Sequence, residues 1–226
     1  MLTKRLPLIF MFICYGVFLT SCTGYRLRYN DNPFAQYGIK SVSIPMFLNQ
    51  TTLAGVSGPM TREIFLQLSN FNKLKVYSGN FNQADAMLVG IIKSPRTLWE
   101  TVRPVQSDTF GAFAPNSRGK RSDFYITTVS NLKLRLQLVL IKRPTAEELE
   151  FIKTSMGDKM KSPKILFNKT LAIDKNFNRE IFDYKVNLSD GQVVNMTQNL
   201  GAQKRAIKSL AKIAALSFKE VVLDAF

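Results

Sequence analysis

The amino-acid sequence predicts an α+β domain, in which a mixed sheet of four to five strands has two helices packed on one face. Two observations lead to this fold class. Segments in which apolar and polar residues alternate recur along the chain and indicate strands, while two stretches carry apolar residues at helical spacing. The N-terminal order of strand, helix and strand favours a crossover, which requires parallel pairing if both strands share the sheet.

Three strands and one helix are expected in the N-terminal half of the chain. Residues 39–45 alternate apolar and polar side chains and end in proline, which predicts a short strand. A loop over 49–58 leads into an amphipathic helix that ends near Ser69. Residues 74–77 predict a brief strand, and the mostly apolar residues 84–92 predict a strand at a central position of the sheet.

The C-terminal half contains the clearest strand and the longest helix. Residues 103–121 hold several Pro and Gly without any periodicity, so we expect a long loop there. Leucine occupies every second position over 132–140, which predicts a strand with one buried face. Residues 165–173 alternate in the same way, and we expect them to form a hairpin with 181–186. From residue 195 to the C-terminus apolar side chains recur with a period of 3.6, which predicts a helix.

The composition excludes several common chemistries. The chain has 226 residues with a formal net charge of +15, two cysteines and no histidine. Without histidine there is no Ser/His/Asp triad, no Cys/His dyad and no imidazole ligand for a metal. No pair of carboxylates and no Ser/Lys centre shows catalytic spacing. We therefore expect a protein that binds rather than catalyses, without a metal ion or a soluble cofactor.

The first residues of the chain resemble a bacterial lipoprotein signal peptide. Lys4 and Arg5 precede an apolar run of 14 residues, which is shorter than the roughly 20 residues that a membrane-spanning helix needs. The sequence Leu-Thr-Ser-Cys at 19–22 resembles the lipobox, in which small residues precede the cysteine that receives a lipid. This resemblance implies that residues 1–21 are removed and that Cys22 carries a covalent lipid. The alternative is an ordinary secretory leader with an incidental cysteine.

Removal of residues 1–21 and lipidation of Cys22 would change the net charge, the number of free thiols and the location of the protein. Removal of Lys4 and Arg5 lowers the net charge of +15 by two. Cys14 leaves with the leader and Cys22 is lipidated, so we expect no disulfide and a domain stabilised by packing alone. Thr23 follows the cysteine in place of aspartate. In the enterobacterial sorting pattern, the absence of that aspartate implies delivery to the outer membrane, with the lipid-anchored domain on the periplasmic side.

A polar segment separates the cysteine from the first regular pattern. Residues 22–37 hold several Asn, Asp and Pro residues and predict a lipidated tether between the membrane and the folded part. Strand and helix patterns begin after this tether, and the chain has no internal repeat. We therefore expect a single domain over 38–226, which is long enough to bury a substantial core.

Three segments of the chain form a set of motifs. They read Cys-Thr-Gly-Tyr-Arg-Leu at 22–27, Val-Ser-Ile-Pro-Met-Phe-Leu-Asn-Gln-Thr at 42–51 with Thr-Arg-Glu at 61–63, and Ala-Asp-Ala-Met-Leu-Val-Gly at 84–90. This set resembles the lipopolysaccharide-assembly lipoprotein family, LptE. The chain departs from the family pattern at Thr23, which is inserted before Gly-Tyr, and at Met60, where the family usually has leucine before threonine.

The resemblance implies an LptE-like domain without enzymatic activity. Proteins of that family are plugs in the lumen of the LptD β-barrel, and they assist its assembly and the insertion of lipopolysaccharide into the outer leaflet. We therefore expect an LptD-like β-barrel and lipopolysaccharide as partners. Nucleic acid is not expected, because an exported chain does not meet it and no recognition motif is present. The alternative is an outer-membrane-tethered scaffold or regulator that binds a cell-wall synthase or a secretion pore.

Basic side chains are the candidate contacts for lipopolysaccharide, whose phosphates accept charge-assisted hydrogen bonds from Lys and Arg. The candidates lie in the long predicted loop and in the basic segment after residue 153, and we expect them to gather at one end of the sheet. They are Arg103, Arg118, Lys120, Arg121, Lys161 and Lys164. The polar strand face of Lys133, Arg135 and Gln137 is a candidate surface toward a hydrated barrel lumen. General solubility charge and plain exposure to solvent are the alternative interpretations.

Overall fold

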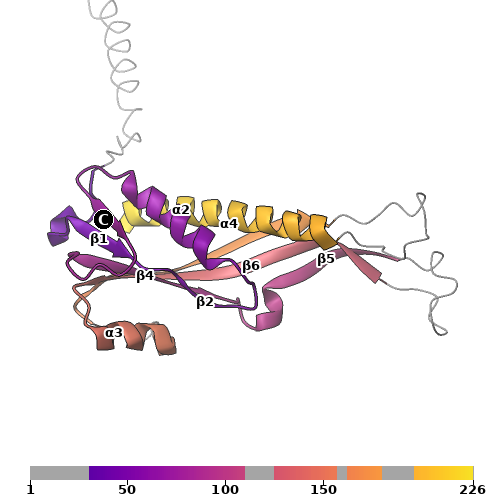
Figure 1. Ribbon diagram of the computed structural model, residues 1–226, viewed down its shortest axis with the longest axis horizontal. Coiled ribbons are helices and arrows are strands. Elements are labelled where there is room, and N and C mark those ends of the chain that lie inside the picture. The colour runs from indigo at the N-terminus through magenta and orange to yellow at the C-terminus, as the bar shows by residue number, and fades with distance from the viewer. Residues whose placement is uncertain (1–30, 110–124, 157–161, 180–195, 226) are drawn as a thin grey trace, which may run out of the picture. The chain divides into compact units, whose positions relative to one another are not determined.

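A seven-stranded mixed sheet, built around one long strand, is the framework of the folded chain (Figure 1). The computed structural model describes residues 31–109, 125–156, 162–179 and 196–225. All of them belong to one compact unit, Asp31–Phe226. No helix in these ranges combines the length and the apolar character needed to cross a bilayer.

Strand β6 (Tyr125–Lys142) is the longest described strand and pairs along both of its edges. On one edge it pairs with β4 (Ala86–Lys93) along its C-terminal part and with β5 (Val102–Thr109) along its N-terminal part. On the other edge it pairs with β7 (Ile165–Asn178). All three pairings are antiparallel. Strand β6 therefore joins the two ends of the sheet.

A parallel unit extends the sheet from the second edge of β4. Strands β1 (Ser41–Ile44) and β2 (Leu48–Gln50) pair with β4 in parallel at successive positions along it. Strand β3 (Lys75–Ser78) pairs in parallel with β1. Helix α2 (Ser57–Ser69) lies between β1 and β3 in the chain. The parallel crossover that the element order predicts is therefore confirmed.

Helices cover the two faces of the sheet unequally. Helices α2 and α4 (Met196–Ala225) lie together on one face (Figure 1). Helix α3 (Ala146–Phe151) and the π-helical turn Ile152–Met156 lie on the opposite face. Two short 3-10 helices, Ala35–Tyr37 and Leu98–Glu100, complete the described helices.

The alternation of side chains in β6 creates an apolar surface on both faces. Its five leucines at even positions are at most 1% exposed and belong to the main core with α2 and α4. A smaller apolar cluster lies on the α3 side of the sheet. It consists of Met87, Val89, Ile91, Val139, Ile141 and Ile152. Because each large apolar side chain stabilises the fold by about 1.5–3 kcal/mol when fully buried, both faces of this region contribute to stability.

The fold class predicted from the sequence is confirmed. The domain is α+β, its sheet is mixed, and α2 and α4 pack on one face. The described sheet has seven strands rather than four to five, and α3 adds a helix on the opposite face. The predicted loop over 49–58 contains the end of β2 and the first two residues of α2. These differences concern short elements, which have too few residues to show a repeating pattern of apolar and polar side chains.

The prediction of a loop over 103–121 is wrong in its first part, because Val102–Thr109 forms β5. This strand pairs with the N-terminal part of β6, and side chains 103–107 are all exposed. A strand without a buried face has no need for alternating apolar residues, and register shifts around Gln106 interrupt it further. The rest of that predicted loop and the expected hairpin partner 181–186 lie outside the described residues.

The folded part of the chain includes residues that the sequence assigns to the tether. Phe34 is 1% exposed and belongs to the main core. The Asn32 side chain accepts a hydrogen bond from the Phe34 backbone N–H (2.9 Å) and donates one to the Ile39 carbonyl (2.6 Å). Phe34 and Asn32 therefore pack and hydrogen-bond as part of the described fold.

A close contact between two motif residues fixes the position of β2 beside β4. The ring of Phe47, which is 2% exposed, lies directly over Gly90 in the middle of β4. A Cβ atom at position 90 would lie 2.5 Å from two atoms of this ring. No side chain larger than hydrogen fits there, so Gly90 serves close packing rather than backbone freedom.

We expect Gly90→Ala to lower the free energy of unfolding by about 2 kcal/mol, because the added methyl group overpacks the core against Phe47. Urea-induced unfolding of the purified protein measures this change. The same substitution should cost less in a Phe47→Ala background, where the ring is absent.

Gly58→Ala is the matched control. A Cβ atom at position 58 meets nothing within 4 Å, and alanine favours the helix, so the effect should stay within about 0.5 kcal/mol of zero. Equal costs at positions 58 and 90 would contradict the packing role assigned to Gly90.

Candidate functional site

The aspartate of the Ala-Asp motif is a structural anchor. The Asp85 Oδ2 atom accepts hydrogen bonds from the Lys40 N–H (3.0 Å), the Ser41 N–H (3.0 Å) and the Ser41 hydroxyl (2.9 Å). The hydrogen bond from the Lys40 backbone is the main reason that the pKa of Asp85 lies below its ordinary value of 3.8, and the Ser41 donors and Arg143 lower it further against the opposing effect of burial. The carboxylate therefore ties the start of β1 to the start of β4.

The Pro-x-Phe-x-Asn-x-Thr motif also holds the fold together. The Asn49 Oδ1 atom accepts hydrogen bonds from the Thr51 N–H (3.0 Å) and hydroxyl (2.7 Å), and its amide donates to the Leu53 carbonyl (2.8 Å). The Thr61 hydroxyl accepts from the Phe47 N–H (3.0 Å) and donates to the Ser57 carbonyl (2.8 Å). These residues organise the loop between β2 and α2 and attach α2 to the chain before β2.

The structure describes two of the predicted lipopolysaccharide contacts and separates them. Arg103 is exposed on β5, opposite Asn131 of β6, and pairs with Glu100 at 3.0 Å. Lys164 lies at the other end of β6, where its carbonyl accepts from the Lys142 N–H and its ammonium pairs with Glu148 at 3.0 Å. At about 3.3 Å per residue, the two positions are roughly 35 Å apart along β6. The other candidate contacts, Arg118, Lys120, Arg121 and Lys161, and the predicted lipidation site Cys22 lie outside the described residues.

An open, basic sheet face is the candidate functional site. It comprises the outward-facing side chains of β4, β5 and β6 on the α3 side, beyond the cover that α3 provides. They are Lys93, Arg103, Lys133 and Arg135, together with Asn131 and Gln137, which lie on the same side of β6 but are buried. Lys133 and Arg135 are exposed, as expected for the polar strand face that the sequence predicts. Gln137 differs from that expectation because it is only 1% exposed.

Hydrogen bonds across strands order part of this basic face. The Lys93 ammonium donates to the Gln137 Oε1 atom (3.0 Å), and the Gln137 amide donates to the Asn168 Oδ1 atom (3.2 Å). Asn131 donates to Asn176 of β7. These bonds satisfy the polar groups of Gln137 at the point where the smaller apolar cluster ends.

Two positive side chains oppose each other directly on this face. Lys93 and Arg135 are cross-strand partners in the register of β4 and β6. Like charges in this position destabilise a sheet unless groups close to them accept hydrogen bonds or carry negative charge, as the Gln137 Oε1 atom does for the Lys93 ammonium. Asp174, opposite Lys133 on β7, and Glu100, which pairs with Arg103, are acidic residues beside this face. The arrangement is therefore suited to binding an anion through several charge-assisted hydrogen bonds.

Sequence reasoning did not identify Lys93 as part of this face, although the signal was present. Positions 87, 89 and 91 are apolar and point to one side of β4, so residue 93 shares that side by the strand period. The pairing of β4 with β6, which brings Lys93 opposite Arg135, depends on the tertiary fold and has no local signal.

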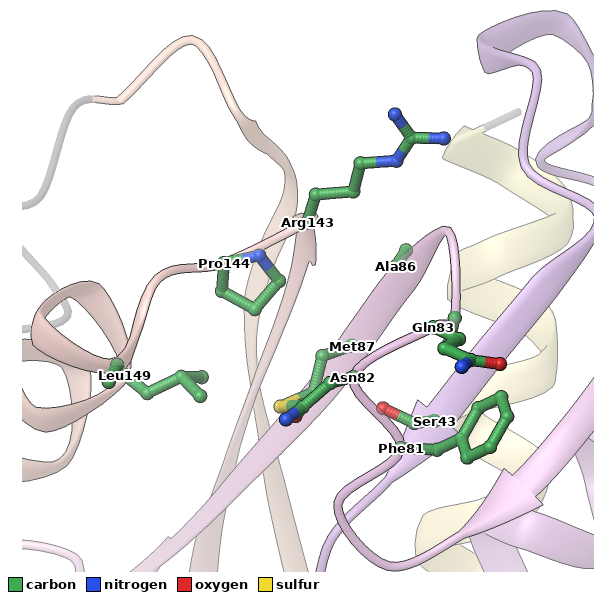
Figure 2. Close-up of a pocket in the computed structure, with 11 residues that line it drawn as sticks. Ser43, Phe81, Asn82, Gln83, Ala86, Met87, Arg143, Pro144 and Leu149 are labelled. Carbon is green, nitrogen blue, oxygen red and sulfur yellow. The ribbon is translucent and has the colours of Figure 1, made fainter.

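A hollow of about 460 Å³ lies between α3 and the edge of β1 and β4 (Figure 2). Met87, Pro144 and Leu149 provide apolar walls, and Ser43, which is fully buried, has a hydroxyl group without a hydrogen-bond partner among the described residues. Figure 2 shows the Arg143 guanidinium directed away from Ser43. Among the described residues that line the hollow, Arg143 is the one ionisable side chain, so they include no acid–base pair for catalysis.

Comparison with protein-family models and with curated proteins finds no match. Solved structures with a similar arrangement include three bacterial proteins. They are the rare lipoprotein B of Shewanella oneidensis (8% identity, 80% of this chain, 98% of that chain, TM-score 0.33), an uncharacterized lipoprotein B of Nitrosomonas europaea (12%, 87%, 88%, 0.35) and a protein of Xanthomonas campestris (9%, 88%, 93%, 0.38). Two of these three neighbours are lipoproteins by name.

We expect Asp85→Asn to lower the free energy of unfolding at pH 7 by about 2 kcal/mol, because hydrogen bonds to a charged acceptor are weakened. In the unchanged protein the contribution of Asp85 is present above pH 3.8 and is lost as the pH falls through the lower folded-state pKa. The variant should therefore lose less stability than the unchanged protein on acidification. Urea-induced unfolding between pH 7 and pH 3 measures both effects.

Glu147→Gln is the control for this substitution, because it makes the same chemical change at an exposed position. Its effect at pH 7 should stay below about 0.5 kcal/mol. If both variants show the same dependence on pH as the unchanged protein, the structural role of the Asp85 carboxylate is contradicted.

Proposed function

We propose that this chain is an outer-membrane lipoprotein that partners an LptD-type β-barrel, assists its assembly and contacts lipopolysaccharide during insertion into the outer leaflet. The lipobox at 19–22 supports the lipid anchor, and the motifs at 42–51 and 84–90 support the family resemblance. In the structure these motifs are the residues that hold β1, β2, α2 and β4 together. The resemblance therefore concerns how the domain is built.

The open basic face is the observation that carries the proposal. Its side chains project from regular strands, so their positions are fixed by the sheet rather than by a loop. A surface inside a barrel lumen must exchange hydrogen bonds with water and with the polar inner wall. The exposed Lys133 and Arg135 meet this requirement, and the apolar cluster beside them is covered by α3.

The same face suits the phosphates of lipopolysaccharide. Lys93, Lys133 and Arg135 provide three positive groups on neighbouring strands, and Arg103 lies two residues further along β6 at the level of Asn131. An anion held by several cations at once gains binding energy without any change in its covalent structure. The role is thus to bind and orient the glycolipid beside the barrel, with no bond made or broken.

Cys22→Ser should abolish lipid attachment, because the thiol is the acceptor of the diacylglyceryl group in the lipobox interpretation. Cells that produce a tagged chain are fed an alkyne-labelled fatty acid, and label on the purified chain is measured. Cys14→Ser is the matched control and should retain the label, since Cys14 lies in the leader. Label that survives in Cys22→Ser, or disappears in Cys14→Ser, would contradict the proposed anchor.

Affinity purification of a tagged copy from detergent-solubilised membranes should recover a large β-barrel together with lipopolysaccharide. The double variant Lys133→Glu/Arg135→Glu should reduce recovery of both, because it reverses charge on the open basic face. Lys40→Glu/Lys75→Glu makes the same change in charge at exposed positions on the β1–β3 side of the sheet and should leave recovery unchanged.

Recovery of a cell-wall synthase or a secretion pore in place of a barrel would favour the scaffold alternative. Absence of any barrel, with a folded and lipidated chain, would refute the proposed role. Equal losses in the two double variants would show that net charge matters and that the open basic face has no special part.

A further inference from the structure

A second basic surface lies on the helical face of the domain, on the opposite side of the sheet from the open basic face. Helix α4 has no acidic residue before Glu220, and its exposed ridge carries residues four positions apart. These are Leu200, Lys204, Lys208 and Lys212. No ion pair in the described part of the chain involves the three lysines. The ridge therefore presents positive charge that no described residue neutralises in an ion pair.

An apolar groove of about 430 Å³ runs beside this ridge, between α4 and the chain that leads into α2. Ala54, Pro59 and Ile207 line it together with Leu200, which is 52% exposed. Lys204 and Lys208 also line the groove, and its described lining includes no acidic residue. Its volume is at the low end of the range for small-ligand sites, which suits one hydrocarbon chain rather than a bundle of several.

Positive charge continues on the other side of α4. A second hollow of about 460 Å³ separates α4 from the end of β7, and Lys175 and Arg205 are among its lining residues. Cations on both sides of one helix match a layer of many anionic groups better than one small anion. Exposed Met196 and Leu200 at the start of the helix add the apolar side chains that enter the interface of a membrane.

We propose that the N-terminal half of α4 docks on anionic phospholipid, with one acyl chain in the groove between α4 and α2 and phosphate groups at Lys204 and Lys208. The combination of an apolar groove and unneutralised lysines at its rim matches an amphiphile with a phosphate head. The inference rests on the proposed lipid anchor, which brings the helix to a membrane, but it does not depend on a barrel partner.

Photo-crosslinking in nanodiscs tests this docking. The purified acylated chain is inserted into discs that contain phosphatidylglycerol or phosphatidylcholine with a photoreactive acyl chain, and the cross-linked peptides are mapped by mass spectrometry. We expect cross-links within 54–59 and 200–208 in the phosphatidylglycerol discs, and about tenfold fewer in phosphatidylcholine discs. Lys204→Glu/Lys208→Glu should lower the yield in phosphatidylglycerol discs by about tenfold or more, since each cation near an anionic surface contributes about fivefold.

Matched controls separate the groove from general charge and general apolarity. Lys40→Glu/Lys75→Glu carries the same change in charge away from α4 and should alter the yield less than about twofold. Leu200→Gln should reduce cross-linking, whereas Leu216→Gln, on the same helix and 56% exposed, should not. Far-ultraviolet circular dichroism and urea midpoints of all variants establish that the fold is intact.

Several outcomes would overturn the inference. Cross-links that map outside the groove, equal yields in the two lipids, or equal losses in the control variants each contradict it. If lipopolysaccharide at the same phosphate concentration displaces the phosphatidylglycerol cross-links, the groove is assigned to the glycolipid instead. If an added acidic protein lowers the cross-link yield, the groove is assigned to a protein partner. Failure of the proposed lipid anchor is recognised separately, because a chain without the lipid is not retained by the discs. The discs contain no β-barrel, so the cross-linking result does not depend on whether the chain recovers a barrel from cells.

Discussion

Burial of the leucine face of β6 is the constraint on which the rest of the structure depends. Five leucines at alternate positions produce an apolar stripe about 30 Å long, which a single short helix cannot cover. The 30-residue helix α4, with α2 beside it, provides the required length. The crossover from β1 through α2 to β3 places that second helix on the correct face. The long helix and the helix of the parallel unit therefore both serve to bury the leucine face of β6.

Once that face is covered, the opposite face of the sheet is divided along its length. At the C-terminal end of β6 it is apolar and covered by α3 and the following turn. Gln137 lies two residues before Val139, at the boundary of the apolar cluster, and forms hydrogen bonds with Lys93 and Asn168. Beyond it, Arg135 and Lys133 are exposed. One end of β6 is thus covered by α3, and the other end carries the exposed charges of the proposed binding face.

The elements that depend on local periodicity could be predicted from the sequence, and those that depend on tertiary pairing could not. The leucine alternation of β6 and the helical period of α4 exist because those segments have one buried face. Strand β5 lacked any signal, because residues 103–107 are exposed and are held in the sheet by their pairing with β6. The candidate site divides in the same way: the polar strand face could be anticipated, whereas the opposition of Lys93 and Arg135 follows from the register of β4 against β6. The motif residues Asp85 and Asn49 could be recognised from their pattern, and only their hydrogen bonds in the structure show that they hold the fold together.

The contact between Phe47 and Gly90 has a consequence for how such sequences diverge. A glycine is tolerated in the middle of a central strand only while a bulky ring fills the space that its missing side chain leaves. Neither position can therefore drift alone: a smaller residue at 47 opens a void, and a larger residue at 90 has no room while the ring remains. Descendants of one ancestor should keep the aromatic–glycine pair or lose both members together, even where overall identity has fallen too low for alignment. The pair is thus a marker by which distant relatives of this chain can be traced.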